Sequence, residues 1–388
     1  MRIALGIVTL SEHGGLQRDC LALASALRAR GHEVEIFAAR CVAPWTAADE
    51  VRMLPNRAPT NHGRDVAFAN AFANVVRARF DLVVGFNKMS GLDVYYCADP
   101  CLLARPASLW RRLSPRRRAR LALERACFEP ASSTSALMLT PESLERYRGA
   151  WRTPDDHLFL LPSRIAPERA KPDLRTETFR RDRRAALGYG DHDILWLWVA
   201  TQPFTKGLDR VLAALSDHPE ARLLVVGPSS GDKRTRRYIH LGNRLGVAEK
   251  VYWLGRRDDI PEIMAAADIL VHPARLDVTG QVILEALVNG LPVVASEICG
   301  FSHHLKTAAA GVVLAEPFDE RSLSAALTLA ANSKCRQLWS DAALDYVRRH
   351  DFARGLDAAA DIVERIGLMR ADFKPLSENA APAQETAG

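Results

Sequence analysis

Apolar residues follow two alternating patterns along this sequence, short continuous runs and longer helical stripes. The runs are rich in Val, Ile and Leu, which is typical of strands buried on both faces of a parallel sheet. The stripes repeat every three or four residues, as on the buried face of a helix. The predicted strands form two sets, 2–8, 33–38, 81–85, 135–139 and 157–161, then 194–199, 222–227, 250–254, 268–272 and 292–296. This alternation predicts an α/β protein with two doubly wound domains.

A charged stretch with three prolines, residues 162–184, separates the two sets of strands. Proline and charge clusters of this kind favour a linker, followed here by the lead-in helix of the second domain. We therefore expect the following divisions: a first domain at 1–165, a second at 166–335, helices at 336–368 that pack across both, and a disordered tail at 375–388.

Composition places the chain among soluble globular proteins. Its 388 residues are 48% hydrophobic and 25% charged, and no apolar run is long enough to span a membrane. The first ten residues lack a signal-peptide cleavage site, so they are better interpreted as a buried strand. Seven cysteines without a CxxC pair indicate reduced thiols in the cytoplasm.

The net charge of +6 comes from one segment. Within residues 105–125, a single glutamate, Glu124, stands against the following arginines: Arg105, Arg111, Arg112, Arg116, Arg117, Arg118, Arg120 and Arg125. Such a cluster can bind nucleic acid, rest on anionic lipid or form an ordinary charged helix face. Trp110 and the interleaved leucines favour an interfacial segment at the membrane surface.

Two carboxylates eight residues apart, Asp277 and Glu285, give the clearest functional signal. A glycine-containing loop carries Asp277, and a helix that we expect to open near Thr279 and Gly280 carries Glu285. With Thr279 as the cap, the free amides from Gly280 and Gln281 onward would face a ligand. Amides at a helix start favour phosphate, and carboxylates favour hydroxyls, so the pattern predicts a site for a nucleotide sugar.

Further polar residues follow predicted strands at the ends where ligands bind in such folds. Gly14 and Gly15 follow the first strand, and their small size would let a ligand approach the backbone. Asp19 then either faces the crevice or only complements the helix dipole, and spacing alone leaves both readings open. Lys206, beside Gly207, stands where a cation can meet a diphosphate.

Other candidate motifs are weaker. The loops at 61–65 and 85–91 are dense in polar and Gly residues, as ligand-binding loops often are. No GxGxxG occurs, which argues against a nicotinamide cofactor, and no P-loop motif occurs either. Asp191 and Asp193 form a DxD, but they precede a strand and are better interpreted as a solvated turn.

Several motifs in the same order resemble the lipopolysaccharide core glucosyltransferase I (WaaG) family of retaining GT-B glycosyltransferases, family 4. These motifs are GGLQRD at 14–19, NHGRD at 61–65, GFNKMSGLDVYY at 85–96, CGF at 299–301 and AEPF at 315–318. The resemblance runs over nearly all of residues 1–365. It implies two Rossmann-like domains facing across a cleft, with the donor nucleotide held mainly by the second domain.

The resemblance also implies an activity, in which UDP-glucose gives glucose to an inner-core heptose of lipid A-core, with retention and without a metal. No cofactor and no nucleic acid partner are expected. The basic segment 103–128 would rest on anionic lipid at the cytoplasmic face of the inner membrane of a Gram-negative bacterium. The membrane residues are Trp110, Arg111, Arg112, Arg116, Arg117 and Arg118.

Roles carry over residue by residue from this resemblance. Glu285 would bind the ribose hydroxyls, Asp277 the donor sugar and Lys206 the diphosphate. Asp19, Asp99 and Asp277 are the catalytic candidates. The other donor-side candidates are Gly14, Gly15, Thr279, Gly280, Gln281 and Arg164, and the acceptor-side candidates are His62, Asn87 and Lys88.

Two departures from the family pattern concern the donor. Asp277 stands where the family has a longer glutamate, and Phe204 and Thr205 stand where relatives often have a second cation beside the lysine. Arg164 in the linker would compensate for that cation. A different UDP-sugar donor therefore stays open, as do a dinucleotide oxidoreductase and a non-catalytic lipid-surface binder.

Overall fold

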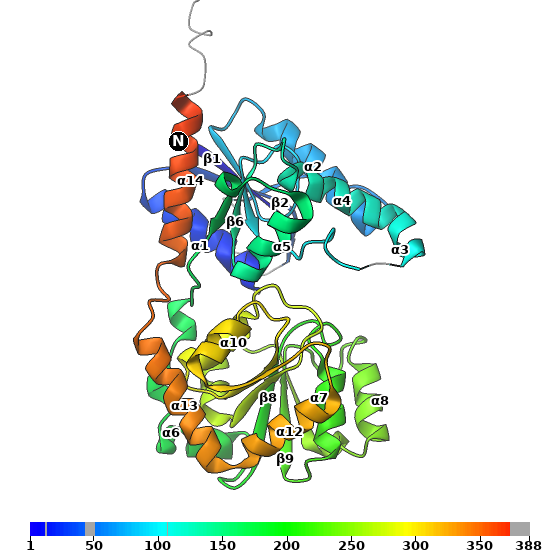
Figure 1. Cartoon of the computed structure of the whole chain (residues 1–388), viewed down its shortest axis with the longest axis vertical. Coiled ribbons are helices and arrows are strands. Elements are labelled where there is room, and N and C mark those ends of the chain that lie inside the picture. The colour runs from blue at the N-terminus through cyan, green and yellow to red at the C-terminus, as the bar shows by residue number, and fades with distance from the viewer. Residues whose placement is uncertain (12–13, 43–50, 107, 373–388) are drawn as a thin grey trace, which may run out of the picture.

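Two parallel β-sheets, each covered by helices, form two lobes stacked one above the other (Figure 1). The structure, a computed structural model, describes residues 1–11, 14–42, 51–106 and 108–372. The predicted fold of two Rossmann-like domains facing across a cleft is confirmed. The tail predicted at 375–388 lies outside the described residues.

The sheet of the N-terminal lobe has seven strands in the order β3-β2-β1-β4-β5-β6-β7. These strands are β1 (Arg2–Ser11), β2 (Glu33–Val42), β3 (Val51–Met53), β4 (Leu82–Gly85), β5 (Val94–Cys97), β6 (Ser135–Met138) and β7 (Leu158–Leu160). The helices around it are α1 (Gly15–Ala29), α2 (Asn61–Val76), α3 (Leu109–Leu113), α4 (Pro115–Phe128) and α5 (Pro141–Trp151).

The sheet of the C-terminal lobe has six strands in the order β10-β9-β8-β11-β12-β13. These strands are β8 (Ile194–Val199), β9 (Ala221–Val226), β10 (Val251–Gly255), β11 (Ile269–His272), β12 (Val293–Ser296) and β13 (Gly311–Leu314). The helices of this lobe are α6 (Glu177–Ala186), α7 (Leu208–Ser216), α8 (Arg236–Arg244), α9 (Ile260–Ala266), α10 (Gln281–Val288), α11 (Ser302–Ala308) and α12 (Glu320–Ala331).

All ten strands predicted from the apolar runs are present, with ends shifted by a few residues. Three further strands, β3, β5 and β13, were not predicted. β3 is a short, largely exposed edge strand, and β13 has only four residues after a glycine. β5 lies inside a stretch that reads as polar because Asp93 precedes its two tyrosines.

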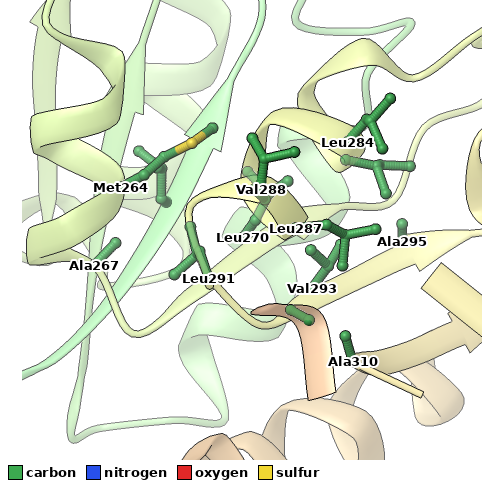
Figure 2. Packing of buried hydrophobic residues seen from close by; sticks show 14 of the residues in the cluster. Met264, Ala267, Leu270, Leu284, Leu287, Val288, Leu291, Val293, Ala295 and Ala310 are labelled. Atoms are coloured by element: carbon green, nitrogen blue, oxygen red, sulfur yellow. The ribbon is translucent and has the colours of Figure 1, made fainter. Parts of the chain in front are cut away.

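Helix α10, which carries Glu285, is fixed by the apolar core of the C-terminal lobe. Leu284, Leu287 and Val288 pack with residues of β11, β12 and α9, as Figure 2 shows. These three side chains are 97–100% buried, and each such side chain contributes roughly 1.5–3 kcal/mol to folding. The core therefore sets the rotation of α10 about its axis, and with it the direction of Glu285.

The chain ends by returning to the first lobe. Helix α13 (Ser333–Arg348) packs on α10, α11 and α12, and α14 (Gly355–Asp372) lies along α1 (Figure 1). Ala359, Ala360 and Val363 of α14 are buried in the core of the N-terminal lobe. The C-terminal helices thus belong to both lobes and fasten them at one side.

Candidate functional site

The turn into α1 depends on glycine. Gly14 has φ +126°, a conformation that L side chains rarely adopt, and a Cβ there would lie 2.1 Å from Oε1 of Gln17. A Cβ on Gly15 would meet no atom within 4 Å. The helix start therefore presents bare backbone to the space between the lobes.

That space is a pocket lined by both lobes and the linker. Its walls include Gly15, Arg18 and Asp19 from α1, Arg164 from the linker, and Thr279, Gln281 and Glu285 from the C-terminal lobe. All of these except Arg18 are among the residues that the sequence suggested for the site, and Lys206 and Asp277 do not line this pocket. A pocket between lobes with several polar groups in its walls is the candidate ligand site.

Asp19 faces this pocket and does not simply complement the helix dipole. Its carboxylate forms an ion pair with Arg164 at 3.0 Å and accepts a hydrogen bond from the hydroxyl of Tyr96, also at 3.0 Å. Burial raises the pKa of Asp19 above its ordinary value, although Arg164 and Tyr96 oppose that shift. A carboxylate with a perturbed pKa in an interlobe pocket is typical of a functional site.

Glu285 faces the same pocket from the opposite lobe. The residue is only 6% exposed, and its carboxylate lies 3.5 Å from Nη2 of Arg18 on α1. Burial raises the pKa of Glu285, while the charges of Arg169 and Arg18 oppose that shift. Glu285 therefore joins the two lobes through a charge contact and is not turned into an apolar interior.

The start of α10 differs from the prediction in one respect. Thr279 does not cap the helix: the N-cap is Gly280, with φ 73° and no side-chain hydrogen bond. Thr279 lines the pocket, and its carbonyl accepts a hydrogen bond from the amide of Phe301. Because no side chain caps α10, its first amides keep their capacity to bind an anion.

Asp277 lies in the loop before α10, in a charged cluster of its own. Its carboxylate is 2.7 Å from Nζ of Lys206 and 2.8 Å from Nε2 of His272. Although burial favours the neutral acid, the hydrogen bond from His272 and the charge of Lys206 hold the pKa of Asp277 well below its ordinary value. Asp277 is thus ionised and already paired before any ligand arrives.

Phe204 and Thr205 stand beside Lys206, where the sequence offers no second cation. Phe204 lies under the guanidinium of Arg275, which is 4.3 Å from the ring centroid. Arg275 is itself paired with Asp209 at 2.6 Å. Arg164, expected to replace a missing cation beside Lys206, instead pairs with Asp19 in the interlobe pocket.

His272, Asp277 and Cys299 each place a ligand atom within 4.8 Å of the others, which is a possible metal-binding geometry. Two features of the donor set weigh against a metal. The ammonium of Lys206 already contacts the same carboxylate, and burial raises the pKa of the Cys299 thiol well above its ordinary value. A neutral thiol is a poor ligand for a divalent cation.

Asp99 lies in a second pocket, inside the N-terminal lobe, and not beside Asp19. This pocket of about 1130 Å³ is lined by Gln17, Asn87, Lys88 and Asp99 among others. It shares Leu16 with the interlobe pocket, so the two are neighbours at the start of α1. The hydroxyl of Tyr95 donates a hydrogen bond to Asp99.

The three acceptor-side candidates have different surroundings. Asn87 accepts a hydrogen bond from the amide of Val8 and lines the second pocket. Lys88 lines it too, but its ammonium is held by the buried carboxylate of Glu124 and by the carbonyl of Pro100. His62 contacts the cap residue Thr60 and is not among the residues lining the described pockets.

The basic segment forms α3 and α4 and extends from the N-terminal lobe (Figure 1). Trp110 is 86% exposed and Leu113 is 68% exposed, while Arg112, Arg116 and Arg118 are exposed and Arg117 is half-buried. The side chain of Arg111 lies outside the described set. Across the described part of the chain, no helix combines the length and apolar character needed to cross a bilayer.

Asp191 and Asp193 lie in a turn at the amino end of β8, where Asp193 accepts a hydrogen bond from the amide of Gly190. Their interpretation as a solvated turn agrees with this position.

The sequence reasoning missed Arg18, Tyr96, Arg169 and His272. Arg18 adjoins Asp19 in the GGLQRD motif, and that adjacency was an available signal. Tyr96 and His272 belong to buried strands and read as core residues until the pairing of the elements is known.

Two family models and several known proteins match this chain. "Glycosyltransferase Family 4" matches residues 13–169, and "Glycosyl transferases group 1" matches residues 179–344. The lipopolysaccharide glucosyltransferase WaaG of Escherichia coli strain K12 is 35% identical over 94% of this chain and 98% of its own length.

Solved structures agree with these matches. The crystal structure of WaaG, described as a glycosyltransferase involved in lipopolysaccharide biosynthesis, has a TM-score of 0.87 and 34% identity, and covers 93% of this chain and 99% of that one. HepE of Anabaena in complex with UDP-glucose has a TM-score of 0.68 and 18% identity, over 96% and 98% of the two chains, and shows the fold alone.

Proposed function

The chain belongs to the family of the lipopolysaccharide glucosyltransferase WaaG, and from this premise we propose that it transfers glucose from UDP-glucose to an inner-core heptose of lipopolysaccharide, with retention. One observation carries the proposal: Glu285 and the uncapped start of α10 face the bare helix start at Gly15 across one pocket.

The donor nucleotide would lie in that interlobe pocket. The carboxylate of Glu285 would accept hydrogen bonds from the ribose hydroxyls, replacing part of its contact with Arg18. The amides of α10 and α1 would bind the diphosphate from opposite sides. HepE, which has the same fold, was crystallised with UDP-glucose.

Cations would stabilise the charge that develops on the departing diphosphate, and such preorganised electrostatics are the largest usual term in catalysis. Lys206, held by Asp277, and Arg164, held by Asp19, are the candidates. The bond between the anomeric carbon and the β-phosphate oxygen would break as the acceptor oxygen bonds to the same face of that carbon. The acceptor proton would leave with the diphosphate, so no protein nucleophile is required.

No metal would be needed, because Lys206 supplies positive charge at the carboxylate that a cation would otherwise occupy. Chelator is therefore expected to leave turnover unchanged. Measured turnover that falls with chelator and returns with one divalent cation would contradict this.

The acceptor would enter from the N-terminal lobe, beside Asn87 and Asp99, with its lipid in the inner leaflet of the inner membrane. The exposed Trp110 and the arginines of α3 and α4 support peripheral binding to anionic lipid on the cytoplasmic side.

Turnover tests the proposal directly. Purified protein is incubated with UDP-glucose, with and without a heptose-terminated core acceptor, and both UDP release and the glucosylated product are measured. Acceptor-dependent formation of an α-linked glucose product is expected. Inactivity with every UDP-sugar would reject the proposal.

A second donor of the same class is favoured by one observation. Asp277 is a methylene shorter than the family glutamate and is paired with both Lys206 and His272. The short, occupied carboxylate would leave more room around the donor sugar, so UDP-galactose or a UDP-N-acetylhexosamine is the alternative. A calorimetric screen of UDP-sugars, followed by turnover, distinguishes these donors.

A further inference from the structure

The second pocket of the N-terminal lobe continues into another cavity on the inner side of the basic segment. That outer cavity has a volume of about 940 Å³ and is lined by Leu102, Arg105, Pro106, Ser114, Arg116, Arg117 and Arg120. Leu102, Arg105 and Arg120 line both cavities. A single groove therefore runs from the start of α1, next to the interlobe pocket, to the arginines of α4.

The inner end of this groove is polar and carries both signs of charge. The side-chain oxygen of Asn87 accepts a hydrogen bond from the amide of Val8, and one carboxylate oxygen of Asp99 accepts a hydrogen bond from the hydroxyl of Tyr95. Among the described residues no partner is recorded for the nitrogen of the Asn87 side chain. Side-chain amides and carboxylates of this kind suit the hydroxyls of a sugar.

The outer end is strongly basic, and its arginines outnumber the acids near them. Arg120 has a long contact of 3.4 Å with Asp65, and both side chains are partly exposed. In the described part of the chain, no acidic partner is recorded for Arg105 or Arg116. Guanidinium groups that share a concave wall and outnumber its acids suit phosphate or carboxylate groups.

The loop that carries Arg105 is held in place from both sides. The buried carboxylate of Glu124 accepts hydrogen bonds from the amides of Leu102 and Leu103 at 2.8 and 2.9 Å. Arg117 donates to the carbonyls of Leu102 and Arg105 at 3.0 and 3.3 Å. Because Glu124 is itself fixed by Lys88, the groove is preorganised at its midpoint.

We propose that this groove is an extended site for a charged saccharide, with the sugar to be modified at Asn87 and Asp99 and a phosphate or carboxylate group of the same acceptor at Arg105 and Arg120. The proposal rests on the proposed function and adds to it a requirement for an anionic acceptor. The proposal also assigns two roles to the basic segment. Arg105 and Arg120 would bind the acceptor, and the exposed Trp110 and Leu113 would contact the membrane.

The test uses the full-length protein and a water-soluble, heptose-terminated core oligosaccharide from which the acyl chains have been removed. The same oligosaccharide with its phosphates removed and its carboxylates reduced serves as the neutral probe. Arg105→Gln and Arg120→Gln are compared with Arg125→Gln, which removes the same charge from an exposed position of α4 that lines neither cavity.

We expect each groove variant to raise KM for the charged oligosaccharide by about tenfold, as for loss of one charge-assisted hydrogen bond, with kcat and UDP affinity unchanged. KM for the neutral probe should be high and equal in all four proteins. Equal KM values for the charged probe, or an equal rise in Arg125→Gln, would overturn the proposal.

Two further measurements distinguish this proposal from the proposed transferase activity and from binding of the same arginines to lipid. Calorimetric binding of the charged oligosaccharide to wild type and variants needs no donor, so it tests the groove even if no UDP-sugar is turned over. Pelleting with phosphatidylglycerol vesicles tests the lipid alternative. Groove variants that lose vesicle binding but keep full oligosaccharide affinity would assign these arginines to the lipid headgroup and overturn the proposal.

Discussion

Asp277 in the loop before α10 and Glu285 on α10 lie eight residues apart and have opposite electrostatic surroundings. Asp277 is paired with Lys206 and His272, all within the C-terminal lobe, and its pKa is lowered. Glu285 contacts Arg18 of the other lobe, and its pKa is raised by burial. One cluster is complete in a single domain, and the other exists only where two domains meet.

This difference separates structural effects from binding effects. Removing a charge from the Asp277 cluster leaves a buried partner unpaired, which destabilises the fold. Removing the charge of Glu285 relieves a desolvated carboxylate, so binding should suffer while stability does not. Four predictions test this contrast, from the largest expected effect to the smallest.

Lys206→Ala is expected to lower kcat by about 10²–10³-fold, the usual cost of removing one group that stabilises a departing charge. The measurement is steady-state transfer from UDP-glucose to a heptosylated core acceptor. Lys334→Ala, at an exposed position of α13, is the control and should keep full activity. If both variants are equally active, the diphosphate does not use Lys206.

Asp277→Asn is expected to lower the free energy of unfolding at pH 7 by about 3 kcal/mol, because Lys206 and His272 lose their charged partner. The folded pKa is below the ordinary value of 3.8, so this stabilisation is present above that pH and is lost as pH falls toward the folded pKa. Urea unfolding at pH 7 and pH 3 should therefore show a gap that narrows in acid.

The matched control for that series is Asp173→Asn, an exposed aspartate of the linker region. A gap between wild type and Asp277→Asn that stays constant with pH would show that the carboxylate charge does not stabilise the cluster.

Glu285→Gln is expected to raise Kd for UDP-glucose by about tenfold, since hydrogen bonds to a charged group contribute about 1.5–3 kcal/mol. Because the pKa of Glu285 is raised above 4.5, donor affinity of the wild type should begin to fall at a higher pH than an ordinary glutamate would cause. The variant should lack this acid limb. Calorimetry between pH 4.5 and pH 8 measures both effects.

The expected effect of Glu285→Gln on the free energy of unfolding has the opposite sign from that of Asp277→Asn. The raised pKa means that ionised Glu285 costs stability above its folded pKa, so Glu285→Gln should be at least as stable as wild type at pH 7. Glu320→Gln, exposed at the start of α12, is the control. Marked destabilisation of Glu285→Gln would show that the contact with Arg18 holds the fold together.

Arg18→Gln is expected to have the smallest effect. Arg18 lowers the pKa of Glu285, so its removal should move the acid limb of donor binding to higher pH. The contact is long, at 3.5 Å, and Arg18 is partly exposed, so we expect a shift of about one pH unit or less. Arg18→Lys should restore most of the wild-type profile, and an unmoved limb would exclude Arg18 as the partner of Glu285.

Much of the fold was readable from local patterns. Continuous apolar runs identified ten of the described strands, because burial on both faces imposes that composition on a parallel strand. The loop before α10 and the helix carrying Glu285 were also predicted, since Gly280 and the apolar stripe are local signals. The prediction of Thr279 as the N-cap was wrong, because Thr and Gly are both acceptable N-cap residues and the structure uses Gly280.

The partners of the acids were not readable in the same way. Nothing in the sequence pairs Arg18 with Glu285, 267 positions along the chain, or Tyr96 with Asp19. Asp99 was predicted to lie near Asp19, but the structure places the two residues in separate, neighbouring pockets.

The sequence by itself determined the two parallel sheets, the linker, the concentration of arginine and the residue types of the site, because each depends on composition and short-range periodicity. Only the tertiary structure decided which charges meet, since ion pairs between lobes depend on how the helices pack and on how the linker sets the lobes together. The lowered pKa of Asp277 and the raised pKa of Glu285 are consequences of that packing.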